Sequence, residues 1–285
     1  MSQADPALWG FTSMFAWGVG DMLARYASIR IGSPSVALGV MALGVVPPLL
    51  AGLLRDSQWS TLASGDFVTL AVLSSLLFPL AYVVFYRGME RGMVSVVSSL
   101  SAGYLVVTTI LTAIFFDEVV GPIKYLLILV ILLGIVLTSA RGRNGASISG
   151  VWYGLTAMMV MGIAFTLWKP MVEDVGPFLA VAAVRVLSTV FLGTYLTVRR
   201  SVRLNFRKGT VVLVMGAGVL DSLGFIAFNL GIELNPVSLV IPIAAAYPAV
   251  TMALAWILLK ERLGRMQMVG ITTVLGGVIA FSAIT

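Results

Sequence analysis

Three charged side chains lie inside long apolar stretches of this sequence, and they are the residues best placed to do chemistry. Asp21, Arg185 and Asp221 are flanked mainly by aliphatic, aromatic and small residues. A charge in such surroundings is costly unless it faces a partner or a water-filled cavity. We therefore expect all three to face the protein interior, where they can bind a solute, carry protons or pair with one another.

The residue types that are missing exclude many reactions. Cysteine and histidine are both absent, so disulfides, thiolate nucleophiles, Ser-His-Asp triads and Cys/His zinc sites cannot form. The glycine–lysine pair of a phosphate-binding P-loop is absent as well. The sequence predicts no catalytic residue, no metal and no cofactor, and hence a protein that is not an enzyme.

The composition is that of an integral membrane protein. Of 285 residues, 59% are hydrophobic and 11% are charged, whereas a soluble domain carries about 25% charged residues. The apolar residues form long unbroken runs, which predict spanning helices and not alternating barrel strands. The net charge of +6 comes from Lys and Arg clustered between these runs, a pattern that indicates membrane topology and no nucleic-acid partner.

Polar residues, glycines and prolines divide the chain into ten apolar segments, each long enough for a helix to cross the bilayer. The predicted spans are 8–28, 34–54, 66–88, 93–115, 123–140, 148–168, 178–198, 210–232, 237–259 and 266–284. The fold class is therefore all-α integral membrane with ten transmembrane helices. The short connections leave no room for a soluble domain.

The basic residues predict an orientation. The connections after the odd-numbered spans contain 14 of the 18 Lys and Arg residues, and those after the even-numbered spans contain three. Because cytoplasmic loops are enriched in Lys and Arg, we expect the odd connections to be cytoplasmic and both termini to lie outside the cytoplasmic (inner) membrane.

The two halves of the sequence are similar to each other. At an offset of 143 residues, segment 80–134 aligns with 223–277, and 18 of 55 positions are identical. An offset of 144 extends the similarity to the front of each half. A repeat of five spans reverses direction in the membrane, so the halves are expected to be inverted repeats. The predicted domains are residues 1–143, with spans one to five, and 144–285, with spans six to ten.

A short acidic motif ends the fourth span of each half. It reads AIFFDE at 113–118 and WILLKE at 256–261, followed by Gly121 and Gly264. Together with the repeat, it resembles the EamA-type permeases of the drug/metabolite transporter (DMT) superfamily. The resemblance implies that the first, third, fourth, sixth, eighth and ninth helices surround a central cavity. It also implies similarity to exporters of amino acids and other metabolites, to nucleotide-sugar and triose-phosphate antiporters, and to drug pumps.

Arg185 and Asp221 are expected at similar depths, and two interpretations of them remain open. They can form a buried salt bridge that locks two helices, or they can bind the carboxylate and the ammonium of a zwitterionic amino acid. Asp21 can pair with Arg25 one turn along the same helix. The candidate substrate-binding residues are Arg185, Asp221, Trp17, Tyr82, Tyr247, Asp21, Ser98, Ser99 and Asn229.

Prolines and acids near span ends have structural interpretations. Pro242 and Pro248 interrupt the backbone hydrogen bonds of the ninth span, which makes them candidate hinge residues. Glu118 and Glu261 each precede another span, and each carboxylate can cap the amides and positive dipole at the start of that helix.

The sequence therefore predicts a secondary transporter that moves a small amphiphilic metabolite, most simply an amino acid with an aromatic or other apolar side chain, across the cytoplasmic membrane by alternating access. It is expected to act as an exporter or exchanger. Its partners are the solute, the bilayer and protons, which Asp21 or Asp221 can carry. Alternatives are a carrier of quaternary amines, drugs or nucleosides, and a passive channel. Gly18, Gly20 and Asp21 also resemble the GxGD motif of intramembrane aspartyl proteases, with Asp221 as second carboxylate, but the partner aspartate of that family lies on an earlier helix. Solute identity, direction, coupling ion and oligomeric state stay open.

Overall fold

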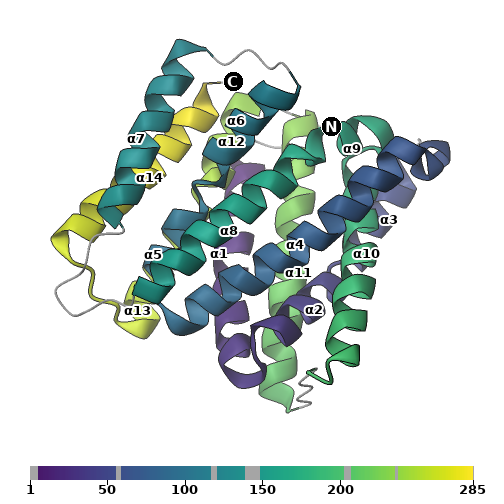
Figure 1. Cartoon of the computed structure of the whole chain (residues 1–285), viewed down its shortest axis with the longest axis horizontal. Helices are drawn as coiled ribbons and strands as arrows, with labels where there is room; N and C mark the ends of the chain where they lie inside the picture. Colours follow the sequence, from purple (N-terminus) through teal and green to yellow (C-terminus); the bar gives the residue numbers. More distant parts are fainter. Residues whose placement is uncertain are drawn as a thin grey trace.

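The computed structural model describes residues 6–55, 59–116, 121–138, 148–201, 207–234 and 237–284, and within these ranges it contains helices and no strand. The elements in chain order are α1 (Pro6–Ile31), α2 (Ser33–Leu43), α3 (Val46–Arg55), the 3-10 helix η1 (Trp59–Ala63), α4 (Gly65–Arg91), α5 (Val94–Ser101), α6 (Tyr104–Phe115), α7 (Pro122–Thr138), α8 (Ile148–Thr166), α9 (Trp168–Val175), α10 (Pro177–Val198), α11 (Lys208–Leu234), α12 (Val237–Ala245), α13 (Tyr247–Leu259) and α14 (Arg265–Ala283). The helices form one bundle (Figure 1).

Most of these helices are apolar enough to cross a membrane. In the described part of the chain, seven stretches meet the length and hydropathy of a span: Ser33–Arg55, Gly65–Arg91, Val94–Phe115, Gly150–Val175, Pro177–Val198, Lys208–Gly231 and Arg265–Ala283. Two shorter apolar helices, Pro122–Thr138 and Ile243–Leu259, accompany them. The remaining predicted span, 8–28, lies in α1, which is as long as the others but carries Asp21, Arg25 and Arg30. The chain is a multi-pass membrane protein.

Several spans are interrupted by a short turn. α5 gives way to α6 at Ala102–Gly103, and α12 gives way to α13 at Ala246. Pro248 sits in the first turn of α13, where its missing N–H costs nothing. The α5–α6 break contains no proline, yet Gly103 lies 143 residues before Ala246. Both halves therefore share a helix break at equivalent positions, and this break forms with or without a proline.

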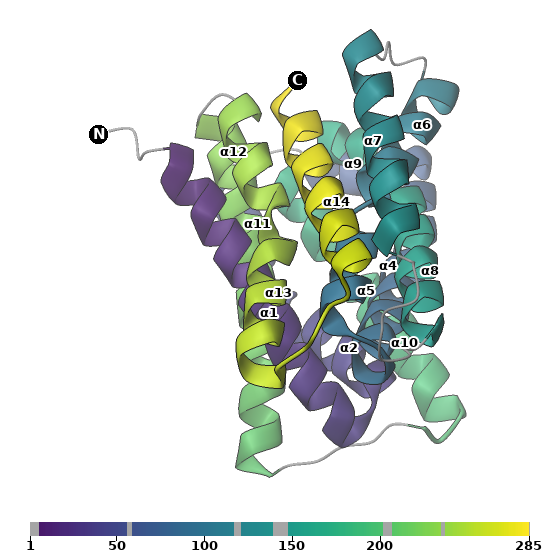
Figure 2. The ribbon, with the colours of Figure 1, turned by 90° about the vertical axis from the view of Figure 1, so that its left-hand side faces the viewer.

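The two halves of the chain interleave. α1 packs mainly against α11 and also contacts α12 and α13, while α8 packs against α4, α5 and α6. The first long helix of each half thus completes the core of the other half. α7 and α14 pack against each other along one side of the bundle (Figures 1 and 2).

The crossing of α1 with α13 matches that of α8 with α6. A side chain at Gly18 would overlap Val250, and the Thr251 hydroxyl donates to the Gly18 carbonyl at 3.4 Å. At the equivalent crossing, the Thr108 hydroxyl donates to the Gly162 carbonyl at 3.1 Å. Glycine permits these close approaches because small residues let helix backbones meet in lipid.

The two ends of the bundle differ in charge. α1 begins and α14 ends at one end, whereas α1, α10 and α13 end at the opposite end (Figure 2). Basic residues at or next to these latter helix ends are Arg30, Arg199, Arg200 and Lys260. Positive charge therefore gathers at one end of the bundle.

A carboxylate from the second half caps a helix of the first half. Glu261, between α13 and α14, accepts hydrogen bonds from the Val94 N–H (2.7 Å), the Ser95 N–H (3.0 Å) and the Ser95 hydroxyl (2.7 Å) at the start of α5. The start of α14 is served instead by Gln267, whose Oε1 accepts from the Gly264 N–H at 3.1 Å. The prediction that Glu261 caps the helix that follows it is therefore wrong, because Glu261 caps α5 and not α14. Glu118 lies outside the described residues.

Replacing Glu261 with alanine should remove all three hydrogen bonds from the first turn of α5. We expect the free energy of unfolding to fall by roughly 1–2 kcal/mol, the usual cost of a lost N-terminal cap. The melting temperature of the purified protein in detergent measures this loss. Glu173→Ala, which removes an exposed carboxylate on α9, is the matched control, and an equal decrease in both variants would contradict the capping role.

Candidate functional site

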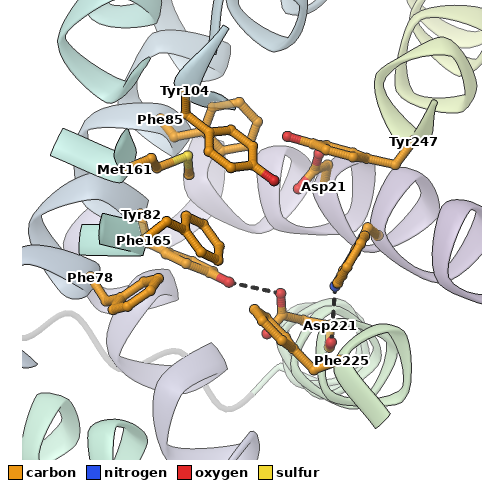
Figure 3. A pocket seen from close by; sticks show the side chains of 11 residues that line it. Asp21, Phe78, Tyr82, Phe85, Tyr104, Met161, Phe165, Asp221, Phe225 and Tyr247 are labelled. Carbon is orange, nitrogen blue, oxygen red and sulfur yellow. Dashed lines mark hydrogen bonds between the residues drawn. The ribbon is translucent and has the colours of Figure 1, made fainter. Parts of the chain in front are cut away.

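A cavity lies among the central helices. Eleven side chains from α1, α4, α6, α8, α11 and α13 line it: Trp17, Asp21, Phe78, Tyr82, Phe85, Tyr104, Met161, Phe165, Asp221, Phe225 and Tyr247 (Figure 3). These helices fall within the six spans that the resemblance to EamA-type permeases places around a central cavity. The wall is aromatic except for two aspartates and one methionine.

Most of the lining consists of equivalent positions from the two halves. Five pairs separated by 143 or 144 residues face this one space: Trp17 and Met161, Asp21 and Phe165, Phe78 and Asp221, Tyr82 and Phe225, and Tyr104 and Tyr247. The cavity therefore lies where corresponding surfaces of the halves meet. The positions equivalent to Asp21 and Asp221 are occupied by Phe165 and Phe78. The two halves therefore contribute equivalent positions to the wall but different charges.

Arg185 and Asp221 form a buried ion pair beside the cavity. Arg185 Nη2 donates to Asp221 Oδ2. The Tyr82 hydroxyl donates to Asp221 Oδ1 at 2.9 Å (Figure 3). Arg185 Nη1 also donates to the Val40 carbonyl at 3.4 Å, and the guanidinium carbon lies 5.3 Å from the centre of the Phe225 ring. The arginine is 4% exposed and the aspartate 8%. Each charge thus has protein partners, as in the salt-bridge interpretation.

A helix break makes room for the arginine. Gly44 lies in the turn between α2 and α3, and a side chain there would overlap the Arg185 guanidinium. The Ser222 hydroxyl, next to Asp221 on α11, donates to the Gly44 carbonyl at 3.2 Å. The turn and the ion pair therefore depend on each other.

Asp21 lies on α1, across the cavity from Asp221 (Figure 3). Its carboxylate accepts a hydrogen bond from the Thr251 hydroxyl at 3.3 Å. Arg25, its expected partner, donates instead to the Met89 carbonyl at 3.2 Å. Among the described residues, Asp21 has no basic partner at ion-pair distance. The expected pairing of Asp21 with Arg25 is therefore wrong.

Aromatic rings around Asp21 hold one another in place. The Trp17 indole N–H donates to the Asp221 carbonyl at 3.2 Å, and the ring meets those of Phe225 and Tyr247 edge-on with centres 5.3 and 5.9 Å apart. Tyr104 begins α6 and Tyr247 begins α13, just after the two helix breaks. Their hydroxyl groups point toward the Asp21 carboxylate (Figure 3). The breaks thus bring two tyrosines and two helix N-termini to the cavity.

A second cavity adjoins the first. It shares the rings of Trp17, Tyr104, Phe165, Phe225 and Tyr247 and extends past Thr108 and Asn229. Asn229 is 5% exposed, and its Nδ2 has no hydrogen-bond partner among the residues that the structure describes. The two cavities together form a mostly apolar space with an acid at one end and a free amide donor at the other.

The other candidate residues lie elsewhere. Ser98 and Ser99 are fully buried in α5, and neither lines either of these two cavities. Pro248 sits in the first turn of α13, whereas the side chain of Pro242 lies outside the described part of the structure. Sequence reasoning missed Phe225 and Met161. The repeat carries the signal for both, since Phe225 is equivalent to Tyr82 and Met161 to Trp17.

Removing either partner of the ion pair should be more damaging than removing both charges. Arg185→Met or Asp221→Asn leaves one buried charge uncompensated, and each should lower the free energy of unfolding by about 3–5 kcal/mol. The double variant should recover part of this loss. Thermal unfolding in detergent measures it, with Asp66→Asn as the exposed control. Strictly additive losses would contradict a direct pair.

Comparisons with known proteins agree with this architecture. The model of the EamA-like transporter family matches the chain twice, over residues 6–140 and 148–283. No curated protein matches. One crystal structure, described only as that of a protein, is similar with a TM-score of 0.68 over 98% of this chain and 97% of the other. The identity is 14%, so this likeness concerns the fold alone.

Proposed function

This chain belongs to the EamA-like transporter family of the DMT superfamily, and from that premise we propose that it is a secondary transporter of a small amphiphilic solute. The observation that carries the proposal is the aromatic cavity with its buried charges, lined by equivalent positions from both halves. Such concave, mostly apolar sites with a few polar groups are typical of small-molecule binding.

The proposed architecture has ten spans in two inverted five-helix repeats, residues 1–143 and 144–285. Two matches to one family model, one in each half, support it. The matched crossings of α1 with α13 and of α8 with α6 support it as well. In this arrangement α1 is the least apolar span, and it is shielded by its neighbours in the second half.

We propose that transport proceeds by alternating access. Inverted repeats can exchange conformations and so give outward-open and inward-open states of similar energy. The breaks before Tyr104 and Tyr247 are the natural hinges because they lie beside the cavity in equivalent helices. Pro242 makes the second hinge the more flexible one because it removes a backbone hydrogen bond, and Pro248 favours the restart of the helix at α13.

Two solute classes fit the cavity. A zwitterionic amino acid, aromatic or otherwise apolar, would place its carboxylate on Arg185 and its ammonium on Asp221, and the ion pair would have to open to admit it. A quaternary amine, a drug-like amine or a nucleoside would use the aromatic faces and leave the pair closed. Protons are the proposed coupling ion, with Asp21 as carrier because its carboxylate faces the cavity without a basic partner among the described residues.

We propose the cytoplasmic membrane as the site and place the basic end of the bundle on the cytoplasmic side. Because α1 begins and α14 ends at the opposite end (Figure 2), both termini would then lie outside. The positive-inside rule supports this orientation.

The protease alternative is disfavoured by the geometry of the two aspartates. An aspartyl dyad needs two carboxylates that share a proton and activate a water molecule. Both oxygens of Asp221 are already engaged, one by Tyr82 and the other by Arg185.

Counterflow in proteoliposomes tests the transport function. Vesicles containing the purified protein and loaded with unlabelled solute should take up labelled solute faster than empty vesicles, and the rate should saturate. The solutes to screen are amino acids, nucleosides, sugar phosphates and organic amines. Uptake that rises linearly with concentration and shows no stimulation by internal solute would indicate a channel instead.

Replacing Pro242 and Pro248 with alanine should slow exchange by about tenfold while solute affinity stays nearly unchanged, as expected for a hinge that limits turnover. Counterflow rates and equilibrium binding separate the two effects. Pro177→Ala, in the first turn of α10, is the control. Unchanged turnover in the double variant would exclude the hinge.

A further inference from the structure

The charges around the cavity do not balance. The described residues at or beside it include one cation, Arg185, and two anions, Asp21 and Asp221. Arg185 and Asp221 neutralise each other through their ion pair. When Asp21 is deprotonated, its negative charge has no basic partner among these residues, and its single hydroxyl partner is Thr251.

A carboxylate in this environment favours the binding of a cation. An uncompensated charge among apolar side chains is costly, and a bound cation removes that cost. The surrounding aromatic rings add to the effect because the faces of Trp and Tyr attract cations electrostatically. Trp17, Tyr104 and Tyr247 all line the cavity with Asp21, and the two tyrosine hydroxyls point toward its carboxylate (Figure 3).

We propose that Asp21 binds the protonated amine of the transported solute, and that the solute class is an amine cation with an apolar or aromatic body. This inference rests on the proposed transport function and names the solute for the same cavity. It assigns the ammonium to Asp21 and not to Asp221, because both Asp221 oxygens already accept hydrogen bonds from Tyr82 and Arg185.

The same geometry disfavours a zwitterion. A solute carboxylate next to the Asp21 site would need a cation nearby, and Arg185 is committed to Asp221 and to the Val40 carbonyl. Arg185 moreover lines a smaller, adjoining space with Met41 and Val184, and does not itself line the cavity that contains Asp21. A free amino acid would therefore bury an unpaired carboxylate, whereas the corresponding amine would not.

The adjoining cavity can hold the apolar body of the solute. The adjoining cavity continues from Trp17 and Tyr247 to Asn229, which lies eight residues beyond Asp221 and thus about 12 Å further along α11. The unpartnered Asn229 amide can donate to a hydroxyl or carbonyl oxygen on the far end of the solute. An arylalkylamine with an acceptor on its ring fits this arrangement.

A proton competes with the amine for the same carboxylate. The titratable and charged groups that face Asp21 are Asp221 on α11, Tyr82 and Tyr86 on α4, Tyr104 on α6 and Tyr247 on α13, with Arg185 behind Asp221. Asp221 is held by its ion pair, so Asp21 is the group whose protonation changes the charge of the site. Amine entry then displaces a proton.

Calorimetric titration of the purified full-length protein in detergent tests the assignment with four matched probes. Phenethylamine carries the cation, 2-phenylethanol replaces it by a neutral hydroxyl, phenylalanine adds a carboxylate, and phenyltrimethylammonium has no titratable proton. We expect phenethylamine to bind at least about tenfold more tightly than the alcohol and phenylalanine. Asp21→Asn should abolish this preference and leave alcohol binding unchanged. Glu173→Gln should change neither.

A second measurement needs no variant. On acidification the affinity of wild-type protein for phenyltrimethylammonium should fall by about tenfold per pH unit once the carboxylate becomes protonated, while 2-phenylethanol binding stays constant. This result would support the assignment even if Asp21→Asn did not fold.

Equal binding of amine and alcohol, retention of the amine preference in a folded Asp21→Asn variant, or a pH-independent cation affinity would overturn the inference. So would wild-type protein that binds no amine. If counterflow then detects another solute, the transport function stands and only the amine assignment fails. If the protein binds the amine but shows no counterflow of any solute, the amine assignment stands and the proposed transport function fails.

Discussion

The buried ion pair between Arg185 and Asp221 is the contact on which the centre of the molecule depends. It joins α10 to α11, and its other hydrogen bonds reach α4 through Tyr82 and α2 through the Val40 carbonyl. Because separating the partners of a buried ion pair is costly in a low-dielectric interior, these four helices have little freedom to move independently. The turn at Gly44 follows from the same requirement, since the guanidinium occupies the space that a side chain would need.

The cavity combines a symmetric scaffold with asymmetric chemistry. The breaks before Tyr104 and Tyr247 and the glycine crossings recur in both halves. The charges do not recur: Phe165, Phe78 and Met41 occupy the positions equivalent to Asp21, Asp221 and Arg185. The duplicated backbone can therefore provide equivalent movements in both halves. Because each charged residue occurs in only one of two equivalent positions, the cavity has a single binding site.

The sequence was informative about which segments form helices and much less so about which side chains interact with each other. Long apolar runs identify helices because hydrocarbon allows few other structures, and burial of charge identifies Arg185, Asp221 and Asp21 as interior residues. The partners of Asp21 and Glu261 were assigned wrongly, to Arg25 and to α14, because helical periodicity describes only the neighbours one turn away. Thr251 and the start of α5 become neighbours through packing between the halves, which no local pattern encodes. Ser98 and Ser99 likewise look polar enough for a cavity wall, yet the rotation of α5 buries them elsewhere.

The interleaving of the halves sets an order of assembly. α1 is synthesised first, but α11, α12 and α13, against which it packs, are synthesised near the end of the chain. Until then Asp21 and Trp17 lack the neighbours that they have in the finished protein, and α2 and α4 are the only early helices that α1 contacts extensively. Until α11 to α13 have been synthesised, α1 carries charged side chains in the bilayer without its final packing partners. During this interval it can insert incorrectly or misfold. Completion of the cavity is therefore a late event in folding, because Trp17 can meet Phe225 only after the ribosome has made α11, and Tyr247 only after it has made α13.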